Sequence, residues 1–321
     1  MKGKGNKGLP FPCPTNGQGE ALPAQTEAHT MVLQQLINGI SIGAVYALIA
    51  VGYSLVYSVL NFSNFAHGEI LMLGSYVGFF ALTALDMPFA LSIALSIIGA
   101  GLIAVLMEKA GYRALRLREA PLLYFMISAM GLSIFLQNFV IVSPIGPNFR
   151  TYPDIFPTKP FTVGTLSIGR LDVVIFVITA ISLALLTWLI YNTKLGSAIR
   201  AASYNMSVAS LMGINPDLIV SIVFFLAGAT AGVGGVLFGM KYTVYPWMGV
   251  LTIKAFIAAV VGGLGSLPGA VLGAFVLGVT ETFAAAYVSS AFRDLFAYTL
   301  MITIVVVRPA GLLGKIAQEK A

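Results

Sequence analysis

The stretch from Val32 to Met107 constrains this chain more than any other feature of its sequence. It holds only two formal charges, Glu69 and Asp86, among mostly apolar side chains. A helix needs about 20 apolar residues to cross a bilayer, so this stretch alone has room for several spans. Over all 321 residues, 58% are hydrophobic and only 9% are charged, whereas soluble domains carry about 25% charged residues. Lipid is therefore the expected solvent.

The apolar runs predict helices rather than strands. They show no alternation of polar and apolar residues, and they are too long for the strands of a membrane barrel. A helix also satisfies its own backbone hydrogen bonds in hydrocarbon. We therefore expect an all-α integral membrane protein, a polytopic bundle of about eight or nine transmembrane helices. The runs cover residues 36–60, 70–85, 88–107, 121–143, 171–191, 218–240, 254–264, 267–290 and 295–307.

The seventh run, 254–264, is too short to span comfortably. The glycine-rich stretch 262–269 follows it and breaks a helix strongly. We expect a broken or re-entrant helix near 254–269, a feature that transporters tolerate where it faces protein or a water-filled cavity.

The two ends of the chain differ from its middle. Residues 1–30 combine three lysines with four prolines and several glycines, and they lack the apolar segment of a signal peptide. This composition predicts a disordered polar extension. The transmembrane domain is expected over 31–314, with a short cytoplasmic tail at 315–321.

Lysine and arginine predict the orientation. The segments 108–120 and 192–217 and the C-terminal tail carry nine basic residues, and these segments share one side if 254–264 crosses the membrane. The opposite side then carries six. The bias places the first group in the cytoplasm and the loop 144–170 outside. The N-terminus then falls outside if the first run is a single span.

Several classes of function are disfavoured. The net charge of +6 is not read as a nucleic-acid footprint, because the basic residues lie mostly between apolar runs, where membrane topology explains them better. Cys13 is the only cysteine, so no internal disulfide is encoded. No G-x-x-x-x-G-K-[ST] pattern occurs, so ATP binding is not expected on this chain, and no cofactor is predicted.

Glycines spaced four residues apart predict close helix packing. Such pairs let helix backbones approach where no hydrophobic effect drives helices together. They are Gly39 and Gly43, Gly74 and Gly78, Gly228 and Gly232, Gly235 and Gly239, and Gly269 and Gly273.

A polar cluster interrupts the first apolar stretch at 61–69 and includes Asn64, His67 and Glu69. Polar groups this close to the membrane need partners when buried. Two alternatives stand: a hydrogen-bonded structural knot, or a direct lining of the substrate path. One histidine and one carboxylate do not make a metal site, so no metal is expected.

Polar residues also occur within later runs. Glu281 lies inside 267–290, where a carboxylate near the bilayer centre costs about 2.5–3.5 kcal/mol, so it should face the bundle interior or water. Gln137 and Asn138, inside 121–143, are weaker cases. Each predicts either an interhelical hydrogen bond or a place in the permeation path.

The segment 193–215 predicts an amphipathic helix between two spans. Leu195, Ile199, Ala202, Met206 and Ala209 recur at spacings of four and three, and Arg200 lies off that stripe. Gly213 and then Pro216 mark the end of the helix. The stripe could rest on the membrane surface or insert into the groove of a partner.

Four stretches taken together resemble the branched-chain amino acid ABC permeases of the LivH type. They follow one another at fitting separations and cover nearly everything from about residue 32 to residue 314. They are Asn64–Glu69 with Leu71–Gly74, Glu108–Arg118 with Ala120-Pro121 and Gly131–Ser133, Leu195-Gly196 with Ile199–Ala201 and Leu211–Asn215, and Gly262–Ala270.

This resemblance implies a type II-like importer permease in a bacterial or archaeal inner membrane, surrounded by lipid. The implied partners are a second homologous permease, two cytoplasmic ATPase subunits and an external solute-binding protein. The segment 193–215 would couple the chain to the ATPases through Leu195, Ile199, Arg200, Met206 and Gly213. Ser207 stands where family members often carry a glutamate, which weakens the case for a salt bridge there.

Rival functions remain. A membrane enzyme would need a convergent catalytic group, and His67 with Glu69 is the only candidate. A self-sufficient secondary transporter or channel would work without ATPases. Close relatives in the family carry urea or short amides, so the substrate class is also open at this stage.

Overall fold

The computed structural model describes residues 24–156, 160–163 and 166–314, and almost all of its regular structure is helical. The elements are α1 (Ala24–Leu60), α2 (His67–Thr83), α3 (Phe89–Met107), the π-helical turn η1 (Glu108–Tyr112), α4 (Arg113–Leu117), α5 (Leu122–Val142), β1 (Phe161–Val163), β2 (Leu166–Ile168), α6 (Arg170–Asn192), α7 (Lys194–Tyr204), α8 (Met206–Leu211), α9 (Pro216–Lys241), the 3-10 turn η2 (Pro246–Val250), α10 (Leu251–Gly262), α11 (Leu267–Tyr287), the 3-10 turn η3 (Ser290–Phe292) and α12 (Arg293–Val307).

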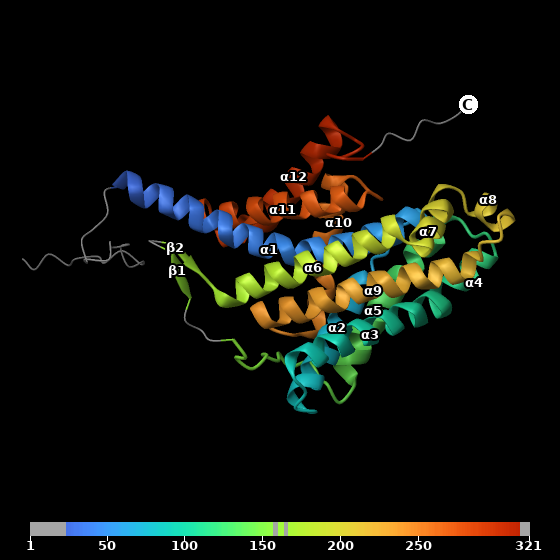
Figure 1. Ribbon diagram of the computed structural model, residues 1–321, viewed down its shortest axis with the longest axis horizontal. Coiled ribbons are helices and arrows are strands. Elements are labelled where there is room, and N and C mark those ends of the chain that lie inside the picture. The colour runs from blue at the N-terminus through green and yellow to red at the C-terminus, as the bar shows by residue number, and fades with distance from the viewer. Residues whose placement is uncertain (1–23, 157–159, 164–165, 315–321) are drawn as a thin grey trace, which may run out of the picture.

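The helices form a bundle around α1 (Figure 1). Side chains of α1 from Ala44 to Val56 are buried, because α1 contacts α6, α9, α10 and α11. In the described residues, seven helices are long and apolar enough to cross a membrane. The shorter α10 is also apolar, and α2, with 17 residues, is the other helix that corresponds to a predicted apolar run. The expected class, an all-α polytopic bundle, is confirmed.

Two ends of the bundle can be told apart (Figure 1). One end carries α4, α7 and α8, whereas the opposite end carries the antiparallel pair β1–β2, in which Thr162 faces Ser167. At the first end, Arg113 and Arg116 both form ion pairs with Asp217. The C-terminal segment reaches the same end, where Leu313 and Ser203 of α7 line one cavity; the Leu313 amide also donates to the Gly262 carbonyl over 2.9 Å. Of the basic segments expected on one side, 108–120 and 192–217 lie at this end, whereas Lys315 and Lys320 lie outside the described residues.

The expected short helix is present as α10. The non-helical stretch through which the chain re-enters the bundle lies on the N-terminal side of α10. After α9 ends at Lys241, the chain pairs Val244 with Arg150 and then turns back into the bundle through η2. The glycine-rich stretch after α10 is a tight turn, in which Gly263 and Gly265 have positive φ angles of 112° and 80°.

A second irregular stretch, 61–66, precedes α2. Asn61 turns the chain with a φ of 54° at the end of α1. A Cβ on Gly52 would lie 3.0 Å from the His67 ring. Gly52 lies about 12 Å before the end of α1, at 1.5 Å per helical residue. Like α10, α2 therefore starts inside the bundle.

The predicted glycine contacts are confirmed. Gly39 and Gly43 face α11, Gly228 and Gly232 face α3, and Gly235 faces α2, where an added Cβ would lie 2.3 Å from the Leu71 carbonyl oxygen. At the chain start, helix α1 already begins at Ala24, inside the extension expected to be disordered. Residues 1–23 and the tail 315–321 lie outside the described residues.

Candidate functional site

Two helix starts meet in the interior of the bundle. The Gly68 amide near the start of α2 donates to the Thr252 hydroxyl near the start of α10, over 2.7 Å. A Cβ on Gly68 would lie 2.4 Å from the Gly249 carbonyl oxygen, so only glycine allows this approach. The chain reaches the start of α2 from one end of the bundle and the start of α10 from the other end. Transporters build their substrate sites where such interrupted helices meet.

Glu69 lies at this junction with only 2% of its surface exposed. Its Oε1 accepts a hydrogen bond of 2.9 Å from the Ser133 hydroxyl of α5. Its Oε2 is buried and has no hydrogen-bond partner in the part of the chain that the structure describes. Gly249 packs directly against the carboxylate, because a Cβ there would overlap Oε1 at 1.8 Å.

His67 points away from Glu69. Its ring is completely buried beside Gly52 and Tyr53 of α1, with the Tyr53 ring centroid 6.3 Å away in an edge-on arrangement. Residues two apart on a helix do not face each other, which explains the divergence. The pair that an enzyme would need is therefore not assembled. In the described part of the chain, no group of three His, Cys, Asp or Glu side chains is placed to hold a metal ion.

Asn64 holds the irregular stretch before α2 in place. Its Oδ1 accepts hydrogen bonds from the Tyr112 hydroxyl over 2.8 Å and from the Ala66 amide over 3.1 Å. Tyr112 belongs to η1, so Asn64 ties the start of α2 to the turn that leads toward α5. This geometry matches the structural alternative for Asn64.

Glu281 forms an ion pair with a lysine of the same chain. Lys254 of α10 donates to its Oε1 over 2.5 Å, and the Tyr46 hydroxyl of α1 donates to its Oε2 over 3.0 Å. Lys254 also pairs with the exposed Asp294 at the start of α12. The hydrogen bonds of Glu281 are thus interhelical. Sequence reasoning missed Lys254 as the partner, because this first residue of the run 254–264 was counted only among the six basic residues on the side opposite the cytoplasm.

Gln137 and Asn138 are less enclosed. Gln137 is half-buried, whereas Asn138 is exposed on the outer face of α5. The Asn138 amide donates to the Ile134 carbonyl of its own helix over 2.7 Å. This bond lies within α5 instead of joining two helices, because the side chain points away from the bundle.

A buried ionic network lies near the end that carries α4. Glu108 is fully buried and accepts from Arg116 over 2.8 Å and from Ser221 of α9 over 3.0 Å. Arg116 also reaches Asp217 at the start of α9, over 3.0 Å. Sequence reasoning used the segment 108–120 for orientation and for the family resemblance but predicted no ion pair among these charges. Eight residues rise about 12 Å along a regular helix, so the sequence did not predict a contact between Glu108 and Arg116. In the structure, the π-helical turn η1 covers Glu108–Tyr112.

The segment 193–215 folds as two helices, α7 and α8. Asn205 separates them and caps α8, accepting from the Val208 amide over 3.0 Å. Gly213 ends the segment with a φ of 82°. Arg200 lies with its guanidinium 5.6 Å from the Tyr191 ring centroid and also donates to the Ile190 carbonyl.

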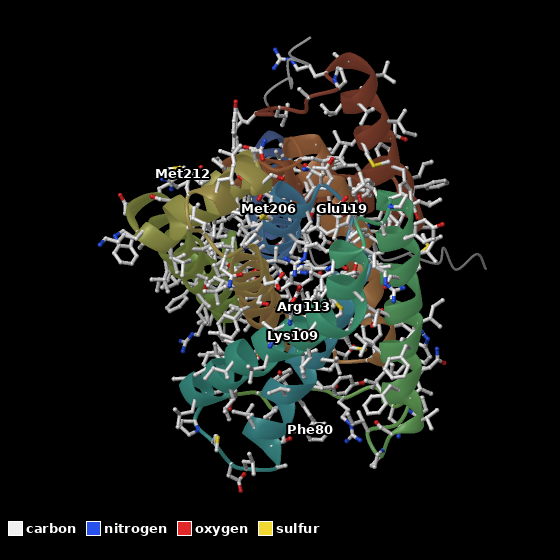
Figure 2. All side chains as sticks on the ribbon, turned by 90° about the vertical axis from the view of Figure 1, so that its right-hand side faces the viewer. Phe80, Lys109, Arg113, Glu119, Met206 and Met212 are labelled. Carbon is white, nitrogen blue, oxygen red and sulfur yellow. The ribbon has the colours of Figure 1, made fainter. Side chains whose placement is uncertain are left out.

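The apolar stripe of this segment faces its own bundle. Ile199, Ala202 and Ala209 are buried in the core, and Leu195 and Met206 pack against that core. An exposed set points outward instead, with exposed fractions of 88% for Tyr204, 85% for Leu211 and 79% for Met212. Figure 2, which looks onto this end, shows Met212 farther out than Met206. The amphipathic pattern of 193–215 therefore predicts a buried face but does not show whether the membrane, a partner or the chain's own bundle covers that face.

Comparison with known proteins decides the family. Residues 35–305 match the family model described as "Branched-chain amino acid transport system / permease component". The chain belongs to this family.

Two relatives show the extent of the match. The LivH permease of Salmonella typhimurium is 39% identical over 92% of this chain and 99% of its own length. The BraD permease of Pseudomonas aeruginosa is 40% identical over 90% and 97%. Among solved structures, one titled "An inward-facing conformation of a putative metal-chelate type ABC transporter" is 15% identical with a TM-score of 0.46, covering 92% of this chain and 93% of that chain.

As a member of the branched-chain permease family, the chain is a multi-pass protein of the cytoplasmic membrane and the permease component of an ABC transporter. It is not itself an enzyme. ABC permeases of this kind work with ATPase and substrate-binding partners.

Proposed function

We propose that this chain is one of two homologous permease subunits in an importer for branched-chain amino acids. Two cytoplasmic ATPases would drive the importer, and an external solute-binding protein would deliver the substrate. The observation that carries the proposal is the extent of the match, because relatives named for branched-chain amino acid transport align with nearly the whole chain.

The end that carries α4, α7 and α8 is assigned to the cytoplasm. Basic residues gather there, on 108–120 and 192–217, as the positive-inside rule requires. The opposite end, with β1, β2 and the loop 144–170, then faces the binding protein. This assignment also places the start of α1 outside.

The α7–α8 segment is assigned as the docking element for the ATPases. Its inward stripe, including Leu195, Ile199 and Met206, anchors the segment to the bundle. Its outward set, Tyr204, Val208, Leu211 and Met212, leaves apolar side chains exposed at the cytoplasmic end. Exposed apolar patches mark interaction surfaces. Arg200 and Gly213 then act by shaping the segment rather than by direct contact.

Movement of this segment has a route into the bundle. Asp217 follows it directly and pairs with Arg116, which pairs with the buried Glu108. Within η1, the Gly111 carbonyl accepts from Ser128 of α5 over 3.1 Å. ATP binding would favour one of two packings of these helices over the other, which is what a switch between outward and inward access needs.

The second permease subunit and membrane lipid would cover the remaining apolar surface. Helices α5 and α12 are the least covered by the rest of the chain. Phe135 and Phe139 of α5 and Ile302 and Val306 of α12 are exposed. Such faces suit either lipid or a homologous neighbour, and we assign part of them to the permease–permease contact.

Uptake by the complete importer tests the proposed function. The chain, its second permease, the ATPases and the binding protein are reconstituted in liposomes with internal ATP, and labelled leucine, isoleucine and valine are added outside. We expect ATP-dependent accumulation of all three, with no competition from excess urea or acetamide. Uptake blocked by urea, or no ATP-dependent uptake of the three amino acids, would contradict the proposal.

A further inference from the structure

Three carboxylates are fully buried in the described part of the chain: Glu69, Glu108 and Glu281. Glu108 pairs with Arg116, and Glu281 pairs with Lys254. Glu69 has no basic partner within ion-pair distance among the described residues, and its Oε2 has no hydrogen-bond partner. Buried charges are normally paired. The protein supplies a cation for Glu108 and for Glu281, but the described residues supply none for Glu69.

The surroundings of Glu69 are polar but uncharged. The Ser133 hydroxyl donates to Oε1, and Gly249 lies against the carboxylate. The neighbouring backbone is already satisfied, since the Gly68 amide donates to Thr252 and the Glu69 amide donates to the Ala66 carbonyl. The unused hydrogen-bonding capacity of this carboxylate is therefore an acceptor, Oε2, and it calls for a donor that carries positive charge.

Helix α5 covers Glu69 on one side through Ser133, and α5 is among the spans least covered by the rest of the described chain. One face of α5 packs inward through Phe125, Ala129 and Val140, while Ile134 and Phe135 on its other side are exposed. Ser133 is half-exposed between these faces and is the residue that touches Glu69. A displacement of α5 would uncover the carboxylate, and α5 is joined to the ionic network at the cytoplasmic end through Ser128 and Gly111.

We infer that Oε2 of Glu69 binds the ammonium group of the amino acid in transit when α5 moves away from α2. The inference rests on the proposed function and names a binding residue within it. Branched-chain amino acids have apolar side chains, so their ammonium and carboxylate are the only charged groups that a pathway can recognise. A primary ammonium supplies both the positive charge and the donors that Oε2 lacks.

Replacing the carboxylate by its neutral isostere separates charge from shape. In the complete importer in ATP-loaded liposomes, Glu69→Gln keeps the size of the side chain and a group that can accept from Ser133, but it removes the charge. Glu69→Asp keeps the charge on a shorter side chain. Glu119→Gln, at an exposed position, is the matched control. Recovery of the assembled complex at wild-type yield shows that each variant folds.

We expect Glu69→Gln to lower the initial rate of leucine uptake at least about tenfold, Glu69→Asp to lower it less, and Glu119→Gln to leave it unchanged. Wild-type uptake by Glu69→Gln would overturn the inference, since a protonated, neutral Glu69 is mimicked by glutamine. Equal loss in the Gln and Asp variants would also overturn it, because shape and not charge would then matter. Failure of the wild-type importer itself would instead count against the proposed function, and with it against this inference.

Discussion

Two buried carboxylates in one bundle are treated in opposite ways. Glu281 receives a lysine from α10 and a tyrosine hydroxyl from α1, so its charge is neutralised within the structure. Glu69 receives a single serine hydroxyl and keeps one oxygen free. Glu281 contacts Lys254 of α10, Glu69 contacts Gly249 of η2 just before α10, and burial alone does not distinguish the two carboxylates. The difference teaches that the partners of a membrane carboxylate, rather than its depth, separate a structural role from a role that awaits a ligand.

The largest effect is expected from removing the cation of the paired site. Lys254→Met leaves Glu281 buried without its cation, which destabilises by about 3–5 kcal/mol. Thermal unfolding of the purified chain in detergent should show the loss. The double variant Lys254→Met with Glu281→Met should recover most of it, because no charge is then left uncompensated. A Lys254→Met variant as stable as the wild type would remove the basis of the comparison.

A smaller loss is expected from filling the space beside the unpaired site. Gly249→Ala places a methyl group against Oε1 of Glu69, and overpacking of this kind costs about 1–3 kcal/mol. Gly131→Ala on α5 is the matched control, since nothing lies within 4 Å of an added Cβ there. The control should be neutral or stabilise by up to about 1 kcal/mol, because alanine favours a helix over glycine. Equal behaviour of the two variants in thermal unfolding would show that the junction is loosely packed.

Neutralising Glu69 should cost little stability. Glu69→Gln breaks no ion pair and keeps an acceptor for Ser133, so the free energy of unfolding should stay within about 1 kcal/mol of the wild type. Glu281→Gln leaves Lys254 with Asp294 as its only ion-pair partner among the described residues, so it should lower the free energy of unfolding by more than Glu69→Gln does. If Glu69→Gln destabilises as much as Glu281→Gln in the same unfolding assay, then Glu69 has a structural partner and the contrast fails.

The smallest effect on stability is expected at the cytoplasmic surface. Met212→Asp changes an exposed residue, so unfolding should shift by no more than about 0.5 kcal/mol. Uptake by the complete importer should nevertheless fall, because the outward set on α7–α8 is assigned to ATPase docking. Ile199→Asp, on the inward stripe, should instead destabilise the chain itself. Normal ATP-driven uptake by Met212→Asp would place the docking surface elsewhere.

The sequence predicts the bundle well because apolar length is a strong signal. All nine apolar runs correspond to helices, and the predicted glycine pairs lie where helices cross. The signal weakens where the chain enters the interior without a helix. The stretches before α2 and α10 are short and mixed in composition, so the sequence marked a break near 254–269 without showing that Glu69 and Gly249 meet.

Pairing between distant residues could not be predicted. Lys254 is 27 residues from Glu281, and Glu108 is separated from Ser221 by even more of the chain. Such partners depend on which helices pack together, which composition does not reveal. The apolar stripe on α7–α8 shows the same limit. Its periodicity predicts that one face is covered, but it does not show whether Ile199 contacts a partner subunit or its own bundle.

Solute flux through the isolated chain tests the central claim most directly, namely that this permease is a passive gate worked by ATPases at the α7–α8 segment. The purified chain alone is reconstituted in liposomes, and entry of labelled leucine is followed with and without ATP and with an imposed ion gradient. The account predicts no flux above that of empty liposomes under any of these conditions. Sustained leucine entry through the single chain would contradict it and identify a self-sufficient transporter.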